Sequence, residues 1–182
     1  MEHNKWQIIN EEYLIYLRNY ENRIPFYDYG ENKLKPFFNT LFVKDDLAFV
    51  TQVTHPKSRH YVMHNNLDFY KIYDVKNDRL LCAVNLNYMF PVPLTEMKEL
   101  EYKNIDLYCC FDNEIKKSQY IKLLKTEMNL ISKMNFKDKA EKLYEFKYKN
   151  PQHIISKRCL NFKQLEQFAV EWNENQKNLI TL

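Results

Sequence analysis

The chain of 182 residues is 45% hydrophobic and 28% charged, and its formal net charge is +3. It has no run of about 20 apolar residues and no basic N-terminal segment followed by an apolar one, so we expect a cytoplasmic protein without a membrane span or a signal peptide. The single glycine, Gly30, excludes the glycine-rich loops of dinucleotide and nucleoside triphosphate sites, and the four cysteines lack paired metal-binding spacing, so no cofactor and no metal are expected.

The first predicted element is a short helix that begins at Asn10. Asparagine is a favourable N-cap, and the two glutamates that follow it place negative charge in the first helical turn. Apolar residues then recur at helical spacing up to Pro25, namely Tyr13, Leu14, Leu17 and Tyr20. The polar segment 27–35 contains Gly30 and predicts a loop.

Two β-hairpins are predicted next, because runs rich in Phe, Val, Leu and Thr are joined by short polar segments. They are expected over residues 36–54, with a tight turn at Asp45 and Asp46, and over residues 69–86. In the following MFPVPL segment, Pro91 and Pro93 cannot donate to a ladder, so a strand there is expected to be short or at a sheet edge.

Three helices are predicted in the C-terminal part, and each has an asparagine at its start. Asn113 (or Asp112), Asn135 and Asn161 are the expected caps. The apolar stripe of the first helix comprises Ile115, Tyr120, Ile121, Leu124, Met128 and Ile131. We therefore expect an α+β fold in one domain over 1–182: a β-rich core at about 1–94 with an N-terminal helix, and a helical part at about 112–182 that covers one side of an antiparallel sheet.

Positive charge is concentrated in the predicted helical part. Residues 115–163 contain 13 Lys and Arg against 4 Asp and Glu, a local excess of +9 that leaves −6 for the rest of the chain. Such segregation is typical of proteins that bind polyanions, although lysines also solvate helix faces.

The run THPKSRH, residues 54–60, places a hydroxyl, two imidazoles, an ammonium and a guanidinium directly after a predicted strand. Thr54, His55, Lys57 and His60 combine proton transfer with fixed positive charge, which suits attack of an RNA 2′-hydroxyl on its neighbouring phosphodiester. A zinc site at the histidines is disfavoured because Lys57 and Arg59 would repel a cation. A solvated basic loop remains the alternative.

Five short motifs occur in one order along the chain. They are EEYLIYL at 11–17, NRIP at 22–25, KPFF at 35–38, THPKSRH at 54–60 and AVNLNYMFPVP at 83–93. In this order the chain resembles the RNase toxins of type III toxin–antitoxin systems, the ToxN/AbiQ family. The resemblance implies a metal-independent endoribonuclease that leaves a 2′,3′-cyclic phosphate, acts in abortive phage infection on cellular or phage RNA, and is inhibited by a small repeated pseudoknot RNA antitoxin in closed protein–RNA rings. It also implies a twisted antiparallel sheet akin to the MazF/Kid toxins.

The resemblance also implies which residues form the catalytic site. Lys35, Thr54 and Lys57 match the family's active-site lysine, hydroxyl and second lysine, while His60 matches the histidine that closes the motif. We expect Lys35 and Lys57 to flank the phosphate, with Lys57 at the oxyanion and Thr54 on a phosphate oxygen. His55 replaces the usual serine, and either histidine is a candidate for proton transfer because imidazole titrates near neutral pH.

RNA contacts are expected from tyrosines and cations near this site. The candidates are Tyr13, which matches the family's helix-1 tyrosine associated with toxicity and RNA contact, and Tyr27, Tyr29, Lys33, Lys35 and Arg59. Tyr27 and Tyr29 could instead cover the core. The alternative function is a non-catalytic RNA-binding regulator that uses the same basic patch; a small-molecule hydrolase is disfavoured because no nucleophile elbow is present.

Overall fold

The structure, a computed structural model, describes residues 5–26, 34–38 and 41–180. Its strands are β1 (Trp6–Ile9), β2 (Phe37–Phe38), β3 (Val43–Lys44), β4 (Leu47–Val50), β5 (Val53–Thr54), β6 (Phe69–Asp74), β7 (Arg79–Asn85), β8 (Phe90–Pro93) and β9 (Met97–Glu99). Its α-helices are α1 (Glu11–Arg18), α2 (Ser58–Val62), α3 (Glu114–Ile131), α4 (Phe136–Lys149), α5 (Ile154–Arg158) and α6 (Phe162–Ile180). None of the helices formed by these residues is both long and apolar enough to cross a membrane.

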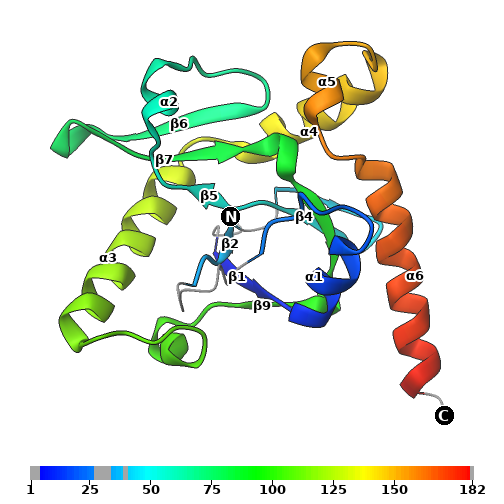
Figure 1. Ribbon diagram of the computed structural model, residues 1–182, viewed down its shortest axis with the longest axis horizontal. Coiled ribbons are helices and arrows are strands. Elements are labelled where there is room, and N and C mark those ends of the chain that lie inside the picture. Colours follow the sequence, from blue (N-terminus) through cyan, green and yellow to red (C-terminus); the bar gives the residue numbers. More distant parts are fainter. Residues whose placement is uncertain (1–4, 27–33, 39–40, 181–182) are drawn as a thin grey trace.

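The strands form three small antiparallel sheets, in the orders β2-β1-β9, β3-β4-β8 and β5-β7-β6 (Figure 1). Both predicted hairpin turns are confirmed, at β3–β4 and at β6–β7. Asp45 and Asp46 have φ values of 51° and 62°, as a two-residue type I′ turn requires. The two arms of the first hairpin nevertheless diverge outside this turn, since β2 pairs with β1 and β5 pairs with β7. The single sheet expected from the sequence is therefore divided into three.

Strands β1 and β9 are absent from the sequence prediction. β1 pairs with β2 on one side and β9 on the other, and all four of its side chains are buried. A fully buried strand lacks the alternation that identifies a half-exposed one, and β1 ends one residue before the α1 cap. The short edge strand β8 was expected, and it pairs with β4 at the sheet edge.

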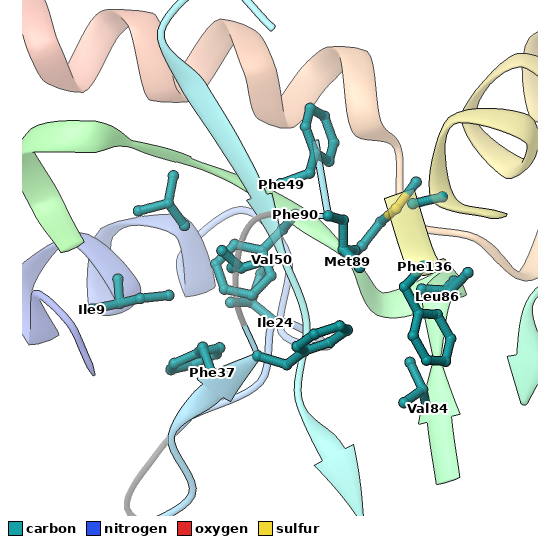
Figure 2. Close-up of a cluster of buried hydrophobic side chains, with 14 of the residues drawn as sticks. Ile9, Ile24, Phe37, Phe49, Val50, Val84, Leu86, Met89, Phe90 and Phe136 are labelled. Carbon is teal, nitrogen blue, oxygen red and sulfur yellow. The ribbon is translucent and has the colours of Figure 1, made fainter. Parts of the chain in front are cut away.

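The core is built largely from aromatic and branched side chains (Figure 2). Phe37 and Phe90, from two different sheets, meet edge to face with ring centroids 5.6 Å apart. Phe136, at the start of α4, contacts Phe38 of β2 in the same way at 5.5 Å. Buried residues of both the β-rich part and the C-terminal helices thus join one cluster.

The predicted helix starts are confirmed where asparagine caps them. Asn10, Asn113 and Asn135 each accept a hydrogen bond from a backbone N–H in the first turn of α1, α3 and α4. Ile115 was wrongly assigned to the buried stripe of α3, because its side chain is 69% exposed. The short helix α5 was not predicted.

The prediction that three C-terminal helices cover one side of a sheet is wrong. α3 packs against β6 and α6 packs against β8, and the two helices stand at opposite sides of the molecule (Figure 1). Because the strands form three sheets instead of one, each helix finds a separate apolar surface to cover.

Candidate active site

The THPKSRH run connects the end of β5 to the start of α2. Thr54 pairs with Ala83 of β7 and is half-buried, whereas the side chains of His55 and Lys57 are exposed. Lys57 has an extended backbone (φ −121°, ψ 156°) and is the N-cap of α2. The run is therefore an ordered strand-to-helix connection that presents His55 and Lys57 to solvent.

His60 lies inside this connection and does not reach the surface. Its side chain is 1% exposed, and its ring packs against Phe69 at a centroid distance of 5.4 Å. The backbone N–H of Lys57 donates to His60 Nδ1 at 3.3 Å, and the His60 N–H donates to the Lys57 carbonyl at 2.8 Å. The prediction that His60 could exchange a proton with substrate is therefore corrected: burial makes it a structural support for Lys57.

The environment of His60 keeps its imidazole neutral. Loss of hydration on burial, together with the charges of Arg59 and Lys57, lowers its pKa. A neutral imidazole has one acceptor nitrogen, and acceptance at Nδ1 from Lys57 requires this neutral form. The lowered pKa and the hydrogen bond thus support the same role.

The Lys35 backbone is held from two sides by residues that sequence reasoning missed. The Gln52 side chain donates from Nε2 to the Lys35 carbonyl at 2.7 Å, and the Tyr120 hydroxyl donates to the Leu34 carbonyl. The peptide groups on both sides of the Lys35 α-carbon are therefore fixed, one by the strand segment that leads to Thr54 and one by α3. The sequence signal for Gln52 was an amide side chain within the run LAFVTQVT, and the structure shows that this side chain is buried.

Lys35 and His55 come together at one small cavity. Both line a space of about 20 Å³ beneath α3, which Tyr120 and Glu127 of that helix also line. This volume is about that of one water molecule. Partial burial and the nearby charge of Lys35 lower the pKa of His55, which favours its neutral form at pH 7.

Glu127 is a second unexpected member of this cavity. Its side chain is 1% exposed, and its Oε1 atom has no hydrogen-bond partner among the described residues. Burial raises its pKa to about 7. The cavity therefore contains two groups, His55 and Glu127, whose protonation changes near or below neutral pH.

Tyr13 is a core residue, which corrects the expectation that it contacts RNA. It is 0% exposed, its hydroxyl donates to the Pro91 carbonyl at 2.7 Å, and its ring meets the Trp172 ring edge to face at 5.6 Å. Burial raises its pKa well above the ordinary value for tyrosine. The helical spacing that placed Tyr13 on the buried stripe of α1 was the correct guide to its role.

The remaining predicted RNA-binding residues divide into two groups. Tyr27, Tyr29 and Lys33 lie outside the described residues, so their predicted contacts stay predictions. Arg59 is exposed on α2, and so is Tyr61, whose side chain is 60% exposed. Tyr61 was not predicted as a site residue, because only the position of α2 in space brings it to the surface beside Lys57.

This geometry brings the His55 imidazole and Lys35 to one cavity, while Thr54 and Lys57 lie within two residues of His55 in the same connection. A neutral imidazole can accept a proton, and fixed cations can stabilise negative charge that develops on phosphate. Such a set can support phosphoryl transfer by an internal hydroxyl.

Comparison with known proteins shows similarity along nearly the whole chain. Residues 5–170 match the family described as Toxin ToxN, type III toxin–antitoxin system. The endoribonuclease ToxN of Bacillus thuringiensis subsp. kurstaki is 23% identical over 175 residues, which cover 93% of this chain and 84% of that protein.

Two solved structures share the fold. One is a chain from a bacterial type III toxin–antitoxin system with selective toxin inhibition by a non-coding RNA pseudoknot; its TM-score is 0.74 at 22% identity, over 95% of this chain and 99% of that chain. The other is AbiQ, a lactococcal anti-phage endoribonuclease of the type III toxin–antitoxin system, with a TM-score of 0.74 at 18% identity over 94% and 98% of the two chains.

Proposed function

Since this chain belongs to the ToxN toxin family of type III toxin–antitoxin systems, we propose that it is an endoribonuclease that cleaves RNA without a metal ion. Cleavage leaves a 2′,3′-cyclic phosphate on one product and a 5′-hydroxyl on the other. The observation that carries the proposal is the meeting of Lys35 and His55 at one cavity, beside Thr54 and Lys57 of the same short connection.

In the proposed reaction His55 acts as the general base. Its lowered pKa keeps the imidazole neutral at pH 7, so it can take the proton of the 2′-hydroxyl while that oxygen attacks phosphorus. The bond from phosphorus to the 5′-oxygen then breaks, and this oxygen leaves with a proton from one of the two lysine ammonium groups, Lys35 or Lys57.

Lys57 and Thr54 stabilise the phosphate during this step. Lys57 offers a charge to the developing oxyanion, and Thr54 donates its hydroxyl to a phosphate oxygen. Removal of one such donor typically slows a reaction by about 100-fold to 1000-fold. The hydrogen bond between the Lys57 backbone and buried His60 supports this role, because it holds the α-carbon of the lysine in place.

The proposed partners are RNA molecules. One solved relative is inhibited by a non-coding RNA pseudoknot and AbiQ is an anti-phage endoribonuclease. By this similarity we propose a repeated pseudoknot RNA as antitoxin, held with the toxin in closed protein–RNA rings, and cellular or phage RNA as substrate. The kinship of the β-rich part to MazF/Kid toxins belongs to the same proposal.

The proposal is tested with purified protein and a mixed cellular RNA in EDTA. We expect fragments that end in a 2′,3′-cyclic phosphate, recognised by their resistance to 3′-end ligation until the cyclic phosphate is removed. Intact RNA at high protein concentration, with RNA still bound, would instead support a non-catalytic regulator. Cleavage that appears only after a divalent metal is added would overturn the metal-independent mechanism.

Lys57→Ala is the matching variant. It should stay folded, because the Lys57 side chain is exposed and its backbone makes the hydrogen bonds to His60. We expect it to lose cleavage in the tube and growth arrest when expressed in cells. Lys142→Ala removes another exposed lysine, from α4, and should retain both activities. Undiminished growth arrest by Lys57→Ala would contradict its assignment.

A further inference from the structure

We infer that a groove between α3 and the turn joining β6 to β7 binds the sugar–phosphate backbone of single-stranded RNA without reading its bases. The groove has a volume of about 1130 Å³. Typical small-molecule pockets have volumes of roughly 300–1000 Å³, so the groove is large enough for a polymer chain. The choice of RNA as ligand rests on the proposed function, and the groove adds a binding site to it.

One wall of the groove is a row of lysines on α3 and the turn that follows it. Lys122, Lys125 and Lys133 are all exposed, and all line the groove together with Asn129. Their spacing places Lys122, Lys125 and Asn129 on one face of α3, and Lys133 lies in the turn that follows the end of the helix at Ile131. At 1.5 Å per residue the helical part of the row, from Lys122 to Asn129, extends about 10 Å, and Lys133 prolongs it, so this wall can contact more than one phosphate.

The opposite wall is the turn between β6 and β7 (Figure 1), which adds Lys76 and Arg79. Among the groove-lining residues that the structure describes, Asp74 is the one acid, and its carboxylate already accepts from Asn77 Nδ2 at 2.6 Å and lies 3.8 Å from Arg79 Nε. Two rows of cations therefore face each other across the groove with little opposing charge. Cations that face each other in this way concentrate positive potential between them, which attracts a polyanion.

The groove adjoins the candidate active site. Leu123 of α3 lines both this groove and the small cavity at Lys35 and His55. Because the two share the Leu123 side chain, we infer that an RNA chain with its scissile phosphate at His55 continues along α3. Three of the thirteen cations of residues 115–163 thus line the groove, together with two cations from the β6–β7 turn outside that segment.

The composition of the groove indicates backbone recognition. Its described lining residues include no aromatic side chain on which a base could stack. Contacts to phosphate and sugar fix the register of a nucleic acid but carry no direct sequence information. Tyr61, exposed on α2 beside Lys57, is by contrast a surface for stacking bases near the site. Base contacts are therefore assigned to the α2 side and backbone contacts to the groove.

The test measures binding of fluorescent single-stranded RNA 20-mers, one of uridine and one of adenosine, by anisotropy at several salt concentrations. Lys57→Ala serves as the background so that the RNA stays intact. We expect a triple variant, Lys122→Ser with Lys125→Ser and Lys133→Ser, to bind both RNAs about tenfold more weakly or worse at physiological salt. The slope of log affinity against log salt should fall in magnitude by about 2, because each phosphate contact to a single strand contributes roughly 0.7.

A matched control removes three exposed lysines elsewhere, Lys137→Ser with Lys142→Ser and Lys157→Ser on α4 and α5. This control loses the same formal charge and should change affinity and slope much less.

Equal losses in both triple variants, an unchanged slope in the groove variant, or a loss confined to one of the two RNAs would each overturn the inference. Displacement of RNA by polyglutamate of matched charge would overturn the assignment to a nucleic-acid backbone. If the natural protein binds RNA through the groove lysines but does not cleave it, the proposed nuclease function is wrong and the groove assignment is still supported.

Discussion

His55 and His60 are separated by five positions in the sequence, yet their surroundings give them different roles. His55 is exposed at the mouth of a cavity that Lys35 also lines, while His60 is 1% exposed and accepts a backbone hydrogen bond. The pKa of each is lowered, chiefly by loss of hydration, which is partial at His55 and nearly complete at His60. The two histidines therefore differ in their access to substrate and not in the direction of their pKa shift: His55 is the candidate base, and His60 supports the Lys57 backbone.

This difference predicts the pH dependence of cleavage. If His55 is the base, the rate should rise as pH rises through its lowered pKa, below 6.5, and then level off at neutral pH. His55→Ala should lower kcat by about 100-fold to 10000-fold and abolish that rise. The measurement is a pH–rate profile on a fluorogenic RNA. His64→Ala, which removes an exposed histidine nearby, should match the natural protein; an unchanged profile in His55→Ala would reject the assignment.

Glu127 predicts a pH dependence of stability. The folded protein holds its proton up to a pKa of about 7, whereas the unfolded chain releases it near 4.5. The free energy of unfolding that this carboxyl contributes is therefore full below about pH 4.5 and is lost as pH rises through 7. Since one pKa unit corresponds to about 1.4 kcal/mol, Glu127→Gln should be more stable than the natural protein at pH 8 by about 3 kcal/mol.

Urea denaturation at pH 5 and pH 8 measures this effect. Glu114→Gln is the matched control, because it removes the same charge from the exposed first turn of α3 and should not alter the pH dependence. If Glu127→Gln instead lowers the free energy of unfolding equally at both pH values, protonation of Glu127 is not the source of the pH dependence.

At the scale of elements, α3 acts as a brace for the segment that carries Lys35. Trp6 Nε1 of β1 donates to the Leu124 carbonyl at 2.9 Å, and Tyr120 donates to the Leu34 carbonyl. These bonds fasten one face of the helix to β1 and to the backbone beside Lys35, while the opposite lysine row faces the groove. One helix thus joins the candidate active site to the candidate RNA-binding groove.

The brace predicts that Tyr120→Phe weakens catalysis through Lys35. Loss of one neutral hydrogen bond is worth about 1 kcal/mol, so kcat should fall about tenfold or less while KM changes little. In a Lys35→Ala background the same substitution should have no further effect. Tyr73→Phe, at a half-exposed tyrosine of β6, is the control. An equal decrease with and without Lys35 would show that Tyr120 acts on another part of the site.

At the scale of the whole molecule, one ion pair ties the β6–β7 hairpin to the C-terminal helices. Asp68 is 2% exposed, and both of its carboxylate oxygens accept from the Arg158 guanidinium of α5 at 2.5 Å. These residues are 90 positions apart. The pair therefore fixes α5 against the start of the hairpin that adjoins the candidate site.

Asp68→Asn should destabilise the protein, because asparagine has no negative charge and has one acceptor oxygen where aspartate offers two to the Arg158 guanidinium. Arg158 is partly exposed, so water screens the loss, and we expect about 1 to 3 kcal/mol from the free energy of unfolding in urea. Glu99→Gln breaks an exposed pair with Lys5 and should cost about 0.5 kcal/mol or less. Similar values for the two variants would show that the buried pair adds nothing beyond a surface pair.

The sequence by itself determined the features that depend on near neighbours. Asparagine caps marked the starts of α1, α3 and α4, the Asp45–Asp46 turn marked a hairpin, and THPKSRH marked a concentration of cationic and titratable groups. Each of these depends on backbone geometry or composition within a few residues, so no knowledge of the fold was needed.

Only the tertiary structure decided which of these groups are accessible and which meet. It buried Tyr13 and His60, brought Lys35 to His55 across 20 positions, and placed Gln52, Tyr120 and Glu127 around them. It also set the α3 lysines opposite the β6–β7 turn, forming a groove that neither segment indicates alone. Burial and long-range proximity depend on how distant elements pack, and the short periodicities of a sequence do not record that packing.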